Sequence, residues 1–148
     1  MHTRHAAAST ALLALLVLAG CNNQRAETAA AAAAVVSDEG ISKTCVVSAV
    51  DPAAGPNASA TMTVGNDGGW CALRVAEKDG QPFATGLVRV RPQHGRIVIA
   101  RAGNRTLVEY YPATGYTGAD TFTAALRSRT PNAPDLTVKV AVTVARQS

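Results

Sequence analysis

The sequence predicts an all-β fold, a two-sheet β-sandwich, over residues 44–148. Four observations lead to this prediction. Short runs rich in Val, Ile and Thr recur after residue 44, Gly, Pro, Asn and Asp separate them, and no helical stripe of useful length interrupts them. One-sided alternation of apolar and polar residues in several runs indicates that each sheet buries one face. A closed barrel is the alternative architecture.

Eight strands are expected in this part of the chain. The last is the clearest, because the five apolar residues from Leu136 to Val144 alternate with a mostly polar set. A period of two places those five side chains on one face of the sheet. The predicted strands cover residues 45–50, 60–64, 70–75, 86–91, 96–101, 106–111, 121–126 and 136–144.

Two packing predictions concern the middle of the chain. In residues 86–91 the alternation predicts that Val88 and Val90 point inward, while Arg89 and Arg91 point outward. The turn residues of the Pro-Gln-His-Gly run at 92–95 then predict a hairpin with the next strand. The single Trp70 is expected at the centre of the sandwich core.

Residues 1–20 have the parts of an export signal. Arg4, with His2 and His5, gives a short basic start, and residues 11–19 form an apolar stretch. Nine residues are too few to span a hydrocarbon layer of about 30 Å, which needs roughly 20 residues of helix. A basic start, a short apolar stretch and small residues after it are typical of a cleaved signal.

The end of this signal, Leu18-Ala19-Gly20-Cys21, resembles the lipobox of bacterial lipoproteins. The resemblance implies cleavage before Cys21 and attachment of a diacylglyceryl group to its sulfur, so membrane lipid is the expected partner at this end. Stable anchoring takes more than one acyl chain. Asn22 favours the outer membrane, facing the periplasm or the cell surface. The alternative is an ordinary secretory signal with a chance cysteine.

The segment between the lipidated cysteine and the domain, residues 21–43, is predicted to be a flexible linker. It contains six consecutive alanines, Ala29 to Ala34, among polar residues with no apolar periodicity. A helix this short is marginal in isolation. As a flexible coil of about 22 residues, the linker would hold the domain roughly 25 Å from the lipid.

Two cysteines remain after Cys21, and an even number in an oxidising compartment indicates a disulfide between Cys45 and Cys71. Two separate buried thiols are the alternative. These thiols and the distant His94 do not form a recognisable metal-ligand set, so neither a metal nor a cofactor is expected.

The folded part carries a mild positive charge, with 11 Lys and Arg against 7 Asp and Glu from Cys45 onwards. Five arginines concentrate in one stretch, at Arg89, Arg91, Arg96, Arg101 and Arg105. An anionic surface is one possible partner for them, but solvated outward positions of strands are the preferred interpretation. No aromatic residues interleave with the arginines, so nucleic-acid binding is not expected.

A second resemblance lies in the last third of the chain. Residues 111–123, YPATGYTGADTFT, resemble the Y-x-P-x-x-G-[FY]-x-G-x-D-x-F motif of bacterial Ig-like and cadherin-like domains, and residues 94–97 resemble the hairpin that precedes it. The resemblance implies an Ig-like sandwich and a structural or adhesive role. Physically, Asp120 can accept backbone N–H bonds and Phe122 can enter the core. Calcium binding by Asp120 is disfavoured, because calcium takes six to eight oxygen ligands and no acidic cluster accompanies this residue.

No enzymatic constellation is evident. His94 is the only histidine after the signal, and no serine lies in a nucleophile-elbow motif. We therefore expect a non-catalytic, lipid-anchored envelope module with a binding or structural role, whose partner is another envelope protein or a glycan. An accessory subunit of a secretion or surface-assembly complex is the alternative. The candidate binding loops contain Asn66, Asp67, Trp70, Tyr116 and Asp120, although both loops can also serve only to close the sandwich.

Overall fold

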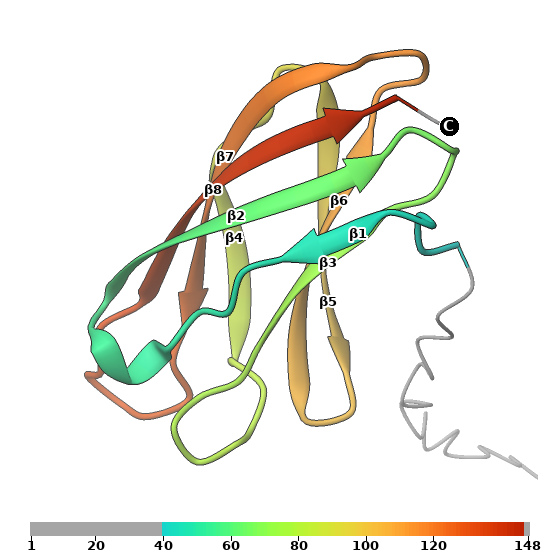
Figure 1. Ribbon diagram of the computed structural model, residues 1–148. Coiled ribbons are helices and arrows are strands. Elements are labelled where there is room, and N and C mark those ends of the chain that lie inside the picture. Colours follow the sequence, from blue (N-terminus) through green and yellow to red (C-terminus); the bar gives the residue numbers. More distant parts are fainter. Residues whose placement is uncertain (1–39, 147–148) are drawn as a thin grey trace, which may run out of the picture. The chain divides into compact units, whose positions relative to one another are not determined.

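The computed structural model describes residues 40–146 of the 148-residue chain, and this part contains two β-sheets and no α-helix (Figure 1). One sheet has five strands in the order β1-β2-β8-β7-β4, and the other has three in the order β3-β6-β5. The predicted signal, Cys21 and the linker up to residue 39 lie outside the described residues. The elements are β1 (Cys45–Val47), a 3-10 helix η1 (Pro52–Ala54), β2 (Asn57–Gly65), β3 (Cys71–Val75), β4 (Thr85–Val90), β5 (Gly95–Ala102), β6 (Arg105–Pro112), β7 (Gly118–Arg127) and β8 (Leu136–Ala145).

The two sheets pack on a common apolar core, which confirms the all-β, two-sheet prediction. The alternating face of β8 supplies five core side chains, none more than 3% exposed. Phe122 of β7, predicted to enter the core, is fully buried there, and Tyr110 of β6 stacks on it with ring centroids 6.1 Å apart. The sheets do not close into a barrel, because β4 and β5 lie at the edges of different sheets.

The chain's early and late strands lie side by side in the larger sheet. β2 pairs with β8 in parallel over nine residue pairs, from Asn57 with Thr137 to Gly65 with Ala145. All other strand pairs are antiparallel. Since β2 and β8 end together, the β2–β3 loop and the end of β8 lie at the same end of the sandwich (Figure 1).

The predicted hairpin between β4 and β5 is wrong. β4 pairs with β7 and β5 pairs with β6, so the turn at residues 91–94 crosses from one sheet to the other. β5 pairs instead with β6, because only two residues, Gly103 and Asn104, separate the two strands in the sequence. The φ angle of Gly103 in this turn is 55°. A glycine accommodates that positive φ without strain.

The predicted inward position of Val90 is also wrong. A register shift between Val88 and Val90 inserts one extra residue, Arg89, into β4, so that Val90 lies opposite Thr123. The neighbours of Thr123 along β7, Phe122 and Ala124, point into the core, and Thr123 therefore points away from it. This β-bulge changes the phase of the alternation and leaves Val90 52% exposed.

Trp70 lies outside the sandwich core, contrary to prediction. It packs on the outer face of the three-stranded sheet with Leu107, Tyr111 and Ile41, and the Trp70 and Tyr111 ring centroids are 6.2 Å apart. The reason is the period of two: the next residue, Cys71, points into the core, so Trp70 points out. Residues 40–42, placed in the linker by the sequence, cover this tryptophan.

Candidate functional site

The disulfide between Cys45 and Cys71 is present in the structure, as predicted. It joins β1 of the larger sheet to β3 of the smaller sheet, with Cα atoms 5.2 Å apart, and Cys71 is fully buried. Just upstream, the Ser42 N–H donates to the Trp70 carbonyl at 2.8 Å, and the Trp70 N–H donates to the Gly40 carbonyl at 2.9 Å. The segment that leads toward Cys21 is therefore fastened to the edge of β3.

The two predicted binding loops lie together at the end of the sandwich where this segment enters. The side-chain amide of Asn66 in the β2–β3 loop donates to the carbonyl oxygens of Ala113 and Tyr116, at 2.8 and 2.7 Å. The predicted site residue Asn66 therefore acts as a bridge between the β2–β3 and β6–β7 loops.

Asp67 holds the entering segment against the same loop. Its carboxylate accepts the N–H of Lys43 at 2.8 Å and the N–H of Gly69 at 3.0 Å. The Lys43 N–H is the largest influence and lowers the pKa of the Asp67 carboxyl; burial opposes it, while the Gly69 N–H lowers the pKa further. The two interactions tie the β2–β3 loop to the start of the folded domain.

Asp120 is the most heavily bonded residue of the predicted site. Its carboxylate accepts the N–H groups of Gln93, His94 and Thr121 at 2.8 to 3.0 Å, and the hydroxyl of Tyr110 at 2.9 Å. Burial alone would raise the pKa of this carboxyl, but the four donors outweigh burial and hold the pKa below its ordinary value of 3.8. The expectation that Asp120 accepts backbone N–H bonds is confirmed, and the interaction fixes the β4–β5 turn.

Tyr116 packs on the same turn. Its ring stacks on the imidazole of His94 with centroids 3.9 Å apart and planes within 8° of parallel, and its hydroxyl donates to the Ala119 carbonyl at 2.6 Å. The structure thus brings together Asn66, Tyr116 and Asp120, each engaged by neighbouring loops. Trp70 is instead buried on the outer face of the smaller sheet, and ligand binding by these loops stays a prediction.

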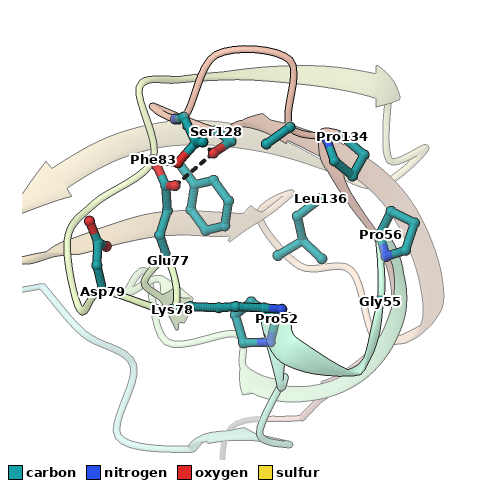
Figure 2. Close-up of a pocket in the computed structure, with 12 residues that line it drawn as sticks. Pro52, Gly55, Pro56, Glu77, Lys78, Asp79, Phe83, Ser128, Pro134 and Leu136 are labelled. Carbon is teal, nitrogen blue, oxygen red and sulfur yellow. Dashed lines mark hydrogen bonds between the residues drawn. The ribbon is translucent and has the colours of Figure 1, made fainter.

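The opposite end of the sandwich contains a cavity that the sequence did not reveal (Figure 2). Its volume is about 430 Å³, within the range of small-ligand sites. Phe83 and Leu136, 4% and 3% exposed, provide its apolar lining, and Figure 2 shows three proline rings around it. The lining residues are Pro52, Gly55, Pro56, Glu77, Lys78, Asp79, Phe83, Ser128, Thr130, Ala133, Pro134 and Leu136.

One wall of this cavity is polar and held in place by hydrogen bonds. Glu77 accepts the Ser128 hydroxyl at 2.7 Å and the Arg129 N–H at 2.8 Å, which joins the β3–β4 loop to the β7–β8 loop. Each carboxylate oxygen retains a lone pair for another donor. The arrangement suits a ligand with an apolar body and a hydrogen-bond donor. Because three separated segments form the cavity, only its prolines and glycine are visible in the sequence, as ordinary turn signals.

Two further features are absent from the described residues. Between Gly40 and Arg146, no three His, Cys, Asp or Glu side chains are grouped so that they can hold a metal ion. The same residues contain no helix of the length and hydropathy needed to cross a membrane.

Comparison with known proteins shows no family for this chain. No family model matches the chain, and no curated protein matches it. Among solved structures, a cysteine protease inhibitor from Entamoeba histolytica is similar with a TM-score of 0.31 and 9% identity, over 60% of this chain and 97% of that one. A similarity of that size carries no functional argument.

Proposed function

We propose that the protein is a lipid-anchored module of the bacterial cell envelope that binds a partner, without catalysis, at the end of its sandwich remote from the anchor. The observation that supports this proposal is that the chain enters the sandwich at the end opposite the cavity. The chain enters the sandwich at Gly40, beside Trp70, whereas the cavity lies between the β3–β4 and β7–β8 loops. Strands of 8 to 10 residues separate the two ends by about 30 Å.

The envelope location is supported by two independent features. The start of the chain resembles a lipoprotein signal ending at Cys21, and the domain contains the Cys45–Cys71 disulfide. Disulfides form and persist in oxidising compartments outside the cytoplasm. An acylated Cys21 followed by 18 residues before Gly40 would keep the domain roughly 25 Å from the membrane.

An Ig-like identity for the sandwich is part of this proposal. In such sandwiches the second, fifth and fourth strands form one sheet, and the third, sixth and seventh form the other. Here β3, β6 and β5 form one sheet while β4, β7 and β8 lie in the other, which is the same grouping of the last six strands once β1 and β2 are taken together as the first strand. The first strand differs, because it pairs with β8, whereas in constant-type Ig domains it lies in the sheet of the second strand. The disulfide differs, since in antibody domains the bridge joins the second and sixth strands.

Two measurements test the anchor. Mass spectrometry of the native amino terminus should find a cleaved chain beginning with acylated Cys21, and replacement of Cys21 by Ala should move the protein out of the membrane fraction. An intact amino terminus without lipid, or full membrane retention of the variant, would contradict the anchor.

Site-specific photo-crosslinking in intact cells tests the binding end. A photoreactive residue at Thr130, on the cavity rim, should give a discrete crosslinked product, while the same residue at Thr114, in the loop at the tether end, should not. Ala133→Trp, which fills the cavity, should abolish the Thr130 product. A product at Thr114 alone would place binding in the tether-end loops and overturn the proposal. The mass of the product distinguishes a protein partner from a glycan.

A further inference from the structure

The edge of the sandwich formed by β4, the turn at residues 91–94 and β5 has an unusual surface, which we call the β4–β5 edge. Only four large apolar side chains are strongly exposed within residues 40–146, and three of them are here: Leu87 at 53%, Val90 at 52% and Val98 at 37%. The bulge at Arg89 places Leu87 and Val90 on the same outer face, opposite Ala125 and Thr123. Val98, between the core-facing Ile97 and Ile99, points out from the smaller sheet, so Leu87 and Val90 are the pair that lies together. Exposed apolar side chains that lie together mark an interaction surface.

The same edge is basic. Residues 80–108 contain five arginines and no Asp or Glu, and Arg89, Arg91 and Arg96 are exposed. The Arg96 guanidinium lies 3.5 Å from the centre of the Tyr111 ring, which fixes its position.

These arginines have no carboxylate partner within residues 40–146: neither an ion pair nor a hydrogen bond joins Arg89, Arg91 or Arg96 to an Asp or Glu. The arginines of the β4–β5 edge are therefore available to an external anion.

A groove runs between the two edge strands at this point. It has a volume of about 390 Å³ and is lined by Val88, Arg91, Pro92, Gly95, Arg96 and Ile97. Apolar side chains in the groove beside guanidinium groups match an amphiphile that has an anionic head and an apolar tail.

The backbone of β4 argues against the addition of another strand to β4. Strand addition needs a regular row of free N–H and C=O groups along the edge, and the bulge at Arg89 interrupts that row. Bulges and charged side chains are the means by which edge strands avoid such pairing. A lipid surface does not require a regular row of free backbone groups. Its phosphates can bind arginine, and its apolar layer can contact Leu87 and Val90 without directional bonds.

We propose that the β4–β5 edge docks on an anionic lipid bilayer, with Arg89, Arg91 and Arg96 contacting lipid phosphates and Leu87 and Val90 entering the headgroup boundary. The inference rests on the proposed function, since the tether is what keeps this edge near a membrane. The β4–β5 turn lies at the tether end, where Asp120 binds its backbone and the Ala113 N–H donates to the His94 carbonyl at 2.8 Å. The cavity at the opposite end stays free.

Vesicle co-sedimentation tests this docking without the lipid anchor. The mature chain from Asn22 to Ser148, secreted behind an ordinary cleaved signal, forms the disulfide but carries no acyl group. It should bind vesicles of phosphatidylglycerol and phosphatidylcholine at low salt, and bind pure phosphatidylcholine far less. Arg89→Ser with Arg91→Ser should weaken binding to the anionic vesicles about 20- to 30-fold. Arg89→Lys with Arg91→Lys should retain most of it.

Two further variants complete the test. Leu87→Ser with Val90→Ser should weaken binding to anionic vesicles several-fold, since both side chains are mostly exposed and the fold does not depend on them. Lys78→Ser with Arg129→Ser removes the same charge in the two loops at the opposite end and should change binding less than twofold. Equal losses in both double variants, or no preference for anionic vesicles, would overturn the docking proposal. The Cys21 measurements judge the anchor separately.

Discussion

Replacement of Asp120 by Ala tests whether this predicted binding residue is in fact a structural centre. The carboxylate accepts four hydrogen bonds, from three backbone N–H groups and the Tyr110 hydroxyl. Two of them, from Gln93 and Thr121, are exposed, and water can replace them at small cost. The other two, from His94 and Tyr110, are partly buried.

The expected loss follows from the two partly buried interactions. A hydrogen bond to a charged group contributes about 1.5–3 kcal/mol, so Asp120→Ala should lower the free energy of unfolding by about 3–5 kcal/mol. For a domain of this size that is a fall in melting temperature of roughly 15 °C or more. Urea denaturation followed by tryptophan fluorescence measures it, since Trp70 is the single tryptophan.

Two control variants make the measurement specific. Tyr110→Phe keeps the ring stacked on Phe122 and removes one donor, so it should cost about 1–2 kcal/mol. Asp67→Ala removes a carboxylate with two donors and should cost clearly less than Asp120→Ala. If Asp120→Ala costs under about 1 kcal/mol, or no more than Asp67→Ala, then Asp120 does not organise this end of the sandwich.

The pH dependence provides an independent check on Asp120. Its pKa is depressed in the folded state, so its contribution to stability is present above the unfolded pKa of about 3.9 and is lost as the pH falls through the lower folded value. The difference between the native protein and Asp120→Ala should therefore be constant from pH 5 to 8 and shrink below about pH 4. A difference that persists unchanged to pH 2 would mean that the ionised carboxylate is not the source.

Three other changes have expected outcomes. Cys45→Ala opens a loop of 26 residues, for which the chain-entropy relation gives about 3.5 kcal/mol, and denaturation of the native protein with and without reductant should show a similar loss. Gly69→Ala places a Cβ 2.5 Å from the Ser42 backbone nitrogen, so it should displace residues 40–42 and speed proteolytic cleavage after Lys43. Phe122→Ala leaves a cavity beside Tyr110 and should cost about 3–5 kcal/mol in the same denaturation assay.

The positions of the strands could be predicted because their signal is local. All eight predicted strands are present, and the inward face of β8 is as its alternation indicated. Strand pairing depends on residues far apart in the sequence. The prediction of a β4–β5 hairpin was therefore wrong, because the strands that pair with β4 and β5 are β7 and β6. The alternation of apolar and polar residues does not reveal a β-bulge, so the outward position of Val90 could not be predicted from it. The cavity was missed because Phe83 and Leu136, which line it, are more than 50 residues apart.

The pair Trp70-Cys71 shows how two adjacent residues determine where the chain enters this domain. Cys71 must point into the sandwich to reach Cys45, so Trp70 must point out from the smaller sheet. An exposed tryptophan is costly, and residues 40–42 cover it by pairing with its backbone. This pairing fixes the point at which the chain enters the sandwich, beside the β2–β3 loop and at the end opposite the cavity. The position of that entry point thus depends on the disulfide, although neither cysteine takes part in the pairing of residues 40–42.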